Sequence, residues 1–260
     1  MNSKGINGFW IKILAVVTMF IDHAGLIVIQ NGFMSLNRNQ ISDTMFNLCV
    51  QIAEGAHLIG RMAFPLFCFL LVEGFIHTHS RTKYLRNLIL FGIISEPIYD
   101  LAMSNSLICW DEQNVLFELA LCLIMLVGLE KIRGFELIYR IVFDTLIVFI
   151  CCEISLFCRL DGGILGVLLV AVFYEYRKEH IKRILASIIV IIVSSMYIYG
   201  SGFKFDTGAI FDLYFIVELI AVGCTMLYDG ERGKKGIKYF FYMFYPVHLI
   251  TLWSIAKLIL

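Results

Sequence analysis

The side chains of this chain that could do chemistry lie inside stretches that otherwise read as lipid-soluble helix. Asp22 and His23 are adjacent in "VVTMFIDHAGLIVI", residues 16–29. A histidine ring exchanges protons near neutral pH, and a neighbouring carboxylate can hold it in one tautomer and raise its basicity. Ionisable groups are costly in hydrocarbon, and that cost favours a functional role. We therefore predict that His23 is a general base and that Asp22 orients it.

Further ionisable residues within or beside apolar stretches are candidates for substrate contacts. Lys12 is eleven positions before His23, which at about 100° per residue places both within roughly 20° of one helical face. His248 follows a proline in "FFYMFYPVHLI", where its alternative role is to satisfy broken backbone. We expect Arg61 and Glu73 to pair or to bind substrate. The predicted substrate-binding residues are Lys12, Arg61, Glu73, Glu96 in "SEPIYD", Asp161 in "RLDGG" and His248.

A basic cluster follows the second long apolar stretch. His77, Arg81, Lys83 and Arg86 lie within "HTHSRTKYLR". Cationic side chains of this kind bind phosphate groups, so the cluster could grip a phosphate-bearing donor such as a coenzyme A ester. The alternative is that these residues only fix the orientation of the chain in a membrane.

The composition indicates a membrane protein. Hydrophobic residues make up 60% of the chain, charged residues only 16%, and the mean hydropathy is +0.83, values outside the range of soluble domains. The 8 cysteines have no metal-ligand spacing, so we expect no metal site. A net charge of +0 gives no indication of a nucleic-acid partner.

We predict an all-α, polytopic helical bundle with about nine transmembrane helices (eight to ten), forming one domain over residues 1–260. Apolar runs of membrane-spanning length are the basis for this count. A further stretch, 41–56, has the apolar spacing of an amphipathic helix at the membrane surface. The predicted spans are Phe9–Ile29, Leu58–Ile76, Tyr84–Met103, Val115–Leu129, Leu137–Cys158, Gly162–Tyr176, Ile184–Tyr199, Ala209–Leu227 and Tyr239–Leu260.

The distribution of charge supports this segmentation. Lysine and arginine concentrate in cytoplasmic loops, and sixteen of the 21 basic residues fall on one side of the predicted spans. The opposite loops contain mainly acidic residues, among them Asp111 and Asp206. We therefore expect a multi-pass protein of the cytoplasmic membrane, in contact with membrane lipid, with a cytoplasmic N-terminus.

Several blocks of the sequence, in this order, resemble the TraX family, membrane proteins associated with acetylation of conjugative pilin. They are "KILAVVTMFIDHAGL", "IGRMAFPLFCFLLVEGFIHTHSRTKYLRNL", "SEPIYD", "NVLFELALCLIML", "DGGILGV" and "FYMFYPVHL". That family in turn resembles the type 3 membrane acyltransferases, whose first span carries an arginine, ten residues and a histidine. Lys12 and His23 occupy this pattern with lysine in place of arginine, and "DGG" replaces the more usual Asp-aromatic-Gly.

The resemblance implies an integral-membrane acyltransferase that takes acetyl from cytosolic acetyl-CoA. The acceptor would be an amine or hydroxyl of a peptide, such as a pilin N-terminus, of a glycan or of a lipid. His23 would serve as the base or as a transient acyl carrier. Two alternatives remain open: a proton-coupled transporter that uses the same ionisable residues, and a non-catalytic assembly factor of a conjugation or secretion system. The sequence leaves both a monomer and an oligomer open.

Overall fold

The computed structural model describes residues 5–35, 41–198, 213–233 and 238–259. Helices and no strands make up the regular secondary structure of these described ranges, which also contain two isolated β-bridges. This confirms the all-helical prediction. The elements are α1 (Gly8–His23), η1 (Ala24–Met34), α2 (Asp43–Gly60), α3 (Ala63–His77), α4 (Arg81–Ser104), α5 (Val115–Lys131), α6 (Leu137–Phe157), α7 (Gly163–Glu175), α8 (His180–Ile198), α9 (Leu213–Cys224), η3 (Thr225–Leu227) and α10 (Lys238–Leu258).

Three helical segments of the described chain are long and apolar enough to cross a membrane. They are Gly8–Met34, Asp43–His77 and Tyr239–Leu258. Two shorter apolar helices, Gly163–Glu175 and Leu213–Leu227, accompany them. Each of the nine predicted spans is mostly helical where it is described, but the second, Leu58–Ile76, runs from the end of α2 through a turn at residues 61–62 into α3. Residue 199 of the seventh span, residues 209–212 of the eighth and residue 260 of the ninth lie outside the described residues. The number of crossings stays a prediction.

Polar residues mark the starts of several helices. The side chain of Ser42 accepts a hydrogen bond from the Met45 backbone N–H (3.3 Å), so it caps α2. Asn114 accepts one from the Leu116 N–H (3.0 Å) and donates another to the Gly92 carbonyl (3.0 Å). Such caps satisfy backbone donors that a helix start leaves without a partner. Asn114 therefore both begins α5 and fastens it to α4.

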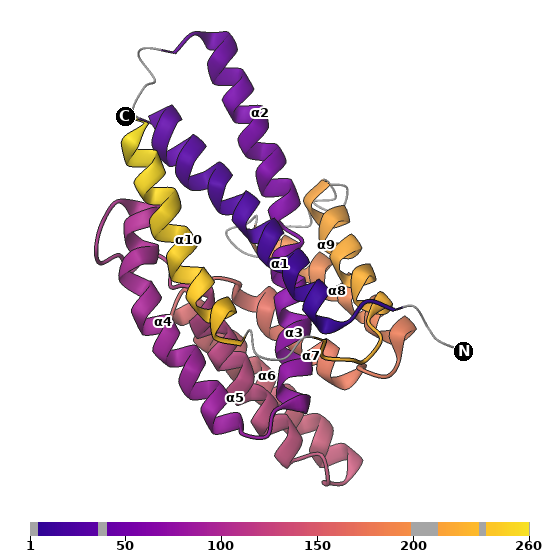
Figure 1. Ribbon diagram of the computed structural model, residues 1–260. Coiled ribbons are helices and arrows are strands. Elements are labelled where there is room, and N and C mark those ends of the chain that lie inside the picture. Colours follow the sequence, from indigo (N-terminus) through magenta and orange to yellow (C-terminus); the bar gives the residue numbers. More distant parts are fainter. Residues whose placement is uncertain (1–4, 36–40, 199–212, 234–237, 260) are drawn as a thin grey trace. The chain divides into compact units, whose positions relative to one another are not determined.

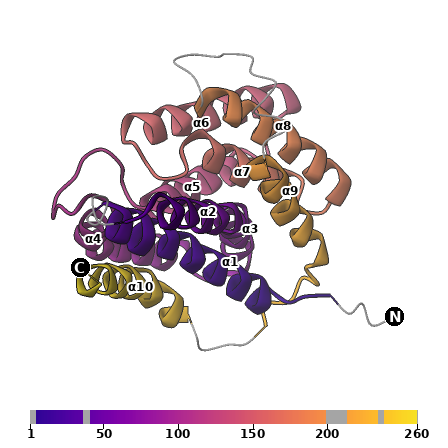
Figure 2. The ribbon, with the colours of Figure 1, turned by 90° about the horizontal axis from the view of Figure 1, so that it is seen from above.

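The described helices fall into two compact units. The first contains α1, η1 and α2, the second half of α4 from Ile93, and α10. Within it α2 packs along α1 and η1, and α10 packs along η1 and also contacts α1 (Figure 1, Figure 2). The segment predicted at the membrane surface, 41–56, thus lies in a helix that packs along the first helix. A π-helix, η1, begins at the residue after His23.

Small residues allow the close packing of the first unit. A Cβ added at Gly25 would come within 2.7 Å of the Ala56 Cβ on α2. One added at Gly32 would meet Ala256 of α10 at 3.0 Å. Small residues at such crossings let helix backbones approach closely, which is a common way to pack helices in membranes. The two glycines therefore hold both faces of η1 against its neighbours.

The second unit contains α3, the first half of α4 and helices α5 to α9. Its helices pack in sequence order, α5 on α6, α6 on α7, α7 on α8 and α8 on α9, and α5 also contacts α7. Pro65 occupies the first turn of α3, where its missing N–H costs no intrahelical hydrogen bond. Leu66, Val167 and Leu169 are among its fully buried core side chains.

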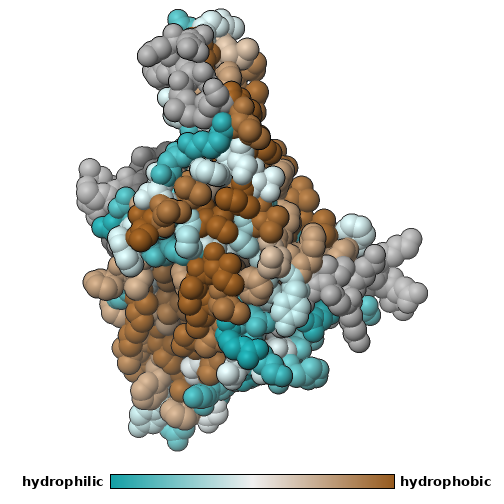
Figure 3. All heavy atoms as spheres, turned by 60° about the vertical axis from the view of Figure 1, so that its left-hand side comes forward, coloured by the Kyte–Doolittle hydropathy of each residue, from teal (hydrophilic) through white to brown (hydrophobic). Residues whose placement is uncertain are grey.

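Large hydrophobic side chains also cover much of the outer surface. On α6, Ile138 is 75% exposed and Phe149 is 59% exposed. Figure 3 shows broad hydrophobic areas on the face that it draws. Contiguous exposed apolar surface of this extent is unusual for a soluble monomer and is expected where lipid covers the helices.

A glycine substitution tests the close packing of η1 against α2. We expect Gly25→Val to lower the free energy of unfolding by about 1–3 kcal/mol, because the added side chain overpacks the contact with Ala56. Gly55→Val is the matched control, since a Cβ there has nothing within 4 Å. Thermal unfolding in detergent measures both. Equal stability of the two variants would contradict this account of the crossing.

Candidate functional site

A buried pair of histidines lies in the first unit. His23 Nδ1, at the end of α1, is 2.7 Å from His248 Nε2 in the middle of α10. The two rings are stacked almost in parallel, with centroids 5.0 Å apart and an interplanar angle of 9°. Both side chains are buried, His23 at 9% exposure and His248 at 3%. The structure thus brings together the predicted base and a predicted substrate-binding residue.

The hydrogen bonds of this pair define the tautomer of each neutral ring. His248 Nδ1 lies 2.8 Å from the Phe244 carbonyl oxygen, which can only accept, so this nitrogen donates a proton. The Nε2 of a neutral His248 is then without a proton and accepts from His23 Nδ1–H. It follows that the proton of neutral His23 is on Nδ1 and that its Nε2 presents a lone pair. This is the arrangement that a general base requires.

Asp22 bonds to a histidine that the sequence reading did not single out. Its Oδ1 lies 2.6 Å from Nδ1 of His57 on α2. Adjacent helix positions point about 100° apart, which explains why Asp22 faces α2 while His23 faces α10. A Cβ at Gly60 would collide with the Asp22 side chain, so the glycine makes room for the carboxylate. The partner that orients His23 is His248, and Asp22 orients His57.

Lys12 and His23 both face α10. The Lys12 Nζ is 4.8 Å from the centroid of the Phe241 ring, and His23 contacts His248 seven residues further along α10. This agrees with the predicted shared face on α1. A cation over an aromatic ring is stabilised by the ring quadrupole, so Phe241 holds the charge of Lys12 beside α10.

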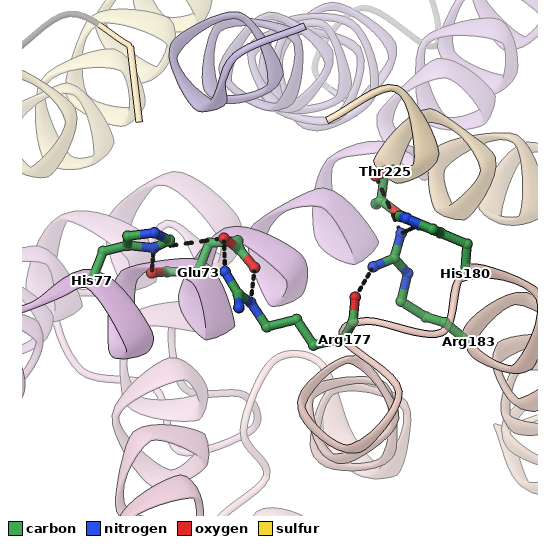
Figure 4. Close-up of polar contacts among 6 residues, drawn as sticks. All are labelled: Glu73, His77, Arg177, His180, Arg183 and Thr225. Carbon is green, nitrogen blue, oxygen red and sulfur yellow. Dashed lines mark hydrogen bonds and ion pairs between the residues drawn. The ribbon is translucent and has the colours of Figure 1, made fainter. Parts of the chain in front are cut away.

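A second polar cluster lies in the second unit and is built around Glu73. This carboxylate is 7% exposed and accepts two hydrogen bonds from Arg177, from Nε at 2.6 Å and from Nη2 at 3.0 Å (Figure 4). His77, one turn along α3, donates from Nδ1 to the Glu73 carbonyl oxygen at 2.9 Å. The two-point geometry matches the planar guanidinium fork to the carboxylate. Glu73 therefore has a specific partner in the half-buried Arg177.

Arg183 extends this cluster toward η3. Its guanidinium donates to the carbonyl oxygens of Arg177 (3.1 Å) and Thr225 (3.2 Å), and to His180 Nδ1 (3.1 Å) (Figure 4). Arg183 is 2% exposed and lies in the first turn of α8, directly before the predicted seventh span. Burial lowers the pKa of its guanidinium, and the charge of Glu73 opposes that shift. Arginine stays protonated in proteins, so the cluster keeps an excess of positive charge.

The residues predicted to bind the donor lie together where α3 ends and α4 begins. Arg81, Lys83 and Arg86 are exposed, and His77 is half-buried. Arg81 forms an ion pair with Glu130, with one hydrogen bond of 2.8 Å, and its guanidinium stacks on Phe75. Part of the positive charge of this set is therefore already balanced within the protein, while Lys83 and Arg86 present theirs to solvent.

The other predicted substrate residues do not join either cluster. Arg61 is exposed in the turn that ends α2. Glu96 is half-buried on α4. Asp161 precedes the left-handed Gly162 that caps α7, and its N–H donates to the Gln113 carbonyl oxygen. Arg61 and Asp161 thus lie beside helix ends, whereas Glu96 lies inside α4.

Glu118 is one of the buried carboxyl groups that the sequence analysis did not single out, although its signal was present. Glu118 is 0% exposed inside α5, accepts a hydrogen bond from Ser155 Oγ (2.7 Å), and is 3.7 Å from the Cys122 sulfur. A single acid in the apolar run "NVLFELALCLIML" is a candidate by the same rule that selected His23. Over the described part of the chain, no three His, Cys, Asp or Glu side chains form a group that could hold a metal ion.

Comparison with known proteins gives two matches that run along most of the chain. The model of the family described as "TraX protein" matches residues 8–256. A curated relative from Dichelobacter nodosus, named "Probable fimbrial assembly protein FimC, serogroup H1", is 29% identical over 277 aligned positions, covering 98% of this chain and 97% of the relative. No solved structure matches the chain significantly.

The Glu73–Arg177 pair can be tested by a double-mutant cycle. We expect Arg177→Gln to lower the free energy of unfolding by about 3–5 kcal/mol, because it removes both guanidinium hydrogen bonds from a buried carboxylate and leaves only His77, 3.6 Å away, beside it. Glu73→Gln/Arg177→Gln should recover most of that loss, because no unpaired charge remains. Arg159→Gln is the control, since its pair with Asp111 is exposed (61% and 87%) and should cost about 0–1 kcal/mol. Strictly additive single and double losses would show that the two residues do not interact.

Proposed function

Because the chain belongs to the TraX family, we propose that it acts at a membrane in the assembly of a pilus or fimbria. The observation that carries this proposal is the likeness along 98% of the chain to a relative named as a fimbrial assembly protein. Three long apolar helices and the exposed hydrophobic surface support a place in the membrane. We further propose the cytoplasmic membrane and about nine spans, on the basis of the asymmetric basic loops.

The geometry of His23 favours a second and finer proposal, that the chain assists assembly by acyl transfer. Its Nε2 lone pair is held in place by the hydrogen bond to His248. In this scheme an amine or hydroxyl acceptor gives its proton to Nε2 while its nitrogen or oxygen attacks the thioester carbonyl of acetyl-CoA. The C–S bond then breaks, and the thiolate takes the proton back from His23. The acceptor is a peptide, such as a pilin N-terminus, a glycan or a lipid.

The donor would be held by phosphate contacts at the junction of α3 and α4. Lys83 and Arg86 are exposed there and carry charge that an anionic donor can reach. Arg81 is bound to Glu130 and would have to exchange that partner for a phosphate. This proposal draws on the family resemblance to the type 3 membrane acyltransferases.

Assembly without chemistry and proton-coupled transport are the competing functions. The relative's name favours assembly and is silent about catalysis. The buried ionisable residues His23, Glu73 and Glu118 would also suit a proton pathway. Release of thiol from acetyl-CoA by the purified protein would support acyl transfer. Substrate-dependent proton flux in vesicles would support transport. The absence of both would support assembly without chemistry.

A histidine substitution distinguishes assembly that depends on acyl transfer from assembly without chemistry. Cells with the wild-type chain, a deletion, His23→Ala or His79→Ala are compared by mass spectrometry of envelope peptides and glycans, and by counting assembled pili. We expect the deletion to abolish assembly, and His23→Ala to reduce the gain of one acetyl group by about 10²-fold or more. His79 is exposed on the loop after α3, so His79→Ala should behave as wild type.

The possible outcomes are distinct. A well-folded His23→Ala protein that still transfers acetyl at the wild-type rate would refute the acyl-transfer proposal. Loss of pili on deletion without any acetyl difference would leave assembly without chemistry. Normal pili in the deletion strain would refute both.

A further inference from the structure

A small cavity in the second unit plays no part in the functions proposed above. It has a volume of about 110 Å³ and lies where the end of α5, the first half of α6 and the end of α7 meet. Its polar lining consists of Arg133, Arg140, Asp144, Tyr174 and Glu175. Sites for drug-sized ligands measure about 300–1,000 Å³. The cavity is therefore of the right size for a small polar group and too small for a whole nucleotide cofactor.

Arg133 brings a positive charge that acts on Asp144 through space but, among the described residues, forms no ion pair within 4 Å. Its Nη1 donates to the Tyr174 hydroxyl at 3.4 Å, and its guanidinium carbon lies 5.2 Å from the centroid of the Tyr174 ring. The tyrosine is buried and fixes the direction of the arginine. A guanidinium has five N–H donors, so most of them remain for an anionic oxygen. Phosphate and carboxylate oxygens both fit this planar donor set.

The other charged residues of the cavity together carry more negative than positive charge. Arg140 donates to Asp144 Oδ2 (3.3 Å) and to Glu175 Oε1 (2.5 Å), so one cation balances two carboxylates. Each carboxylate uses one oxygen for Arg140, which leaves its second oxygen for another donor. The Arg140–Asp144–Glu175 group therefore carries one net negative charge and Arg133 one positive charge. A ligand with both a phosphate and an ammonium group would satisfy the two.

The surroundings of the cavity favour an amphipathic ligand. Leu129, Val148 and Ala171 complete its lining. On α6, Ile141 is 56% exposed and Leu146 is 48% exposed, so the helix beside the cavity presents apolar surface outward. Lys131 and Arg133 belong to the basic loops that mark the predicted cytoplasmic border of the membrane, where phospholipid headgroups lie.

We propose that this cavity binds the headgroup of an aminophospholipid, with the phosphate at Arg133 and the ammonium at Asp144 and Glu175. Phosphatidylcholine offers the same phosphate but no N–H donor for the carboxylates. Phosphatidylglycerol offers the phosphate without any ammonium group. The site is independent of pilus assembly and of acyl transfer, because it uses none of the residues assigned to them.

Native mass spectrometry of the purified full chain, delipidated in detergent, tests the proposal. The chain is offered equimolar phosphatidylethanolamine, phosphatidylcholine and phosphatidylglycerol, and the lipid retained is counted. We expect about tenfold more phosphatidylethanolamine than phosphatidylcholine, the difference that charge-assisted hydrogen bonds to the ammonium would give. Free phosphoethanolamine at the same concentration should not displace the lipid, because the apolar surroundings also hold the acyl chains.

Two variants test the phosphate contact and the ammonium contact separately. Arg133→Gln should lower the retention of all three lipids about tenfold, since each has the phosphate. Glu175→Gln should bring the retention of phosphatidylethanolamine close to that of phosphatidylcholine. Arg159→Gln, at an exposed pair elsewhere in this unit, should leave every ratio unchanged.

Three results would overturn the proposal. They are equal retention of phosphatidylethanolamine and phosphatidylcholine by the wild-type chain, preferential retention of phosphatidylglycerol, and wild-type retention by Arg133→Gln. Displacement by free phosphoethanolamine would reassign the cavity to a soluble ligand and would overturn the lipid assignment. If a variant does not fold, the comparison of the three lipids on the wild-type chain decides alone.

Discussion

The hydrogen bond between His23 and His248 is the interaction on which the functional account depends. It joins residues 225 positions apart and links the end of α1 to the middle of α10 at 2.7 Å. A buried polar group without a partner costs about 1–3 kcal/mol, so two rings that satisfy each other can remain in apolar surroundings. Because the Phe244 carbonyl oxygen fixes the proton of His248, the same bond leaves Nε2 of His23 as an acceptor. The hydrogen bond that allows both rings to be buried is therefore also the one that leaves His23 Nε2 as a proton acceptor.

Buried polar groups in the second unit also need partners, and there charged side chains are involved. Glu73 is compensated by Arg177, and Glu118 is held by Ser155. Arg183 ties the start of α8 to η3 through backbone carbonyl oxygens. The cavity beside Arg133 is one place where this compensation is incomplete. Buried polar groups in both units therefore mark either a fixed contact between helices or a place for a ligand.

The positions of the helices could be predicted from the sequence, because apolar runs and the polar residues between them are local features. The partners of the buried side chains could not. Asp22 and His23 are neighbours in sequence, yet one faces His57 on α2 and the other His248 on α10, since helical geometry separates adjacent side chains. From the sequence, Arg177 could be placed only among the basic residues of a predicted cytoplasmic loop. Its pairing with Glu73 depends on tertiary packing, because the two residues are 104 positions apart. The π-helix after His23 follows from no residue pattern that is visible in the sequence. Glu118 could have been found, because a lone acid in an apolar run is visible before any folding.

The tautomer of His23 is the most direct test of the central claim, that His248 prepares His23 as a proton acceptor. Nitrogen NMR of the full chain with ¹⁵N-labelled histidine rings, assigned by comparison with His23→Gln and His248→Gln, reports which ring nitrogen carries the proton. The structure predicts a protonated Nδ1 and an unprotonated Nε2 on His23, and a protonated Nδ1 on His248. A His23 ring protonated on Nε2, or one that exchanges freely between tautomers in the folded protein, would contradict the account.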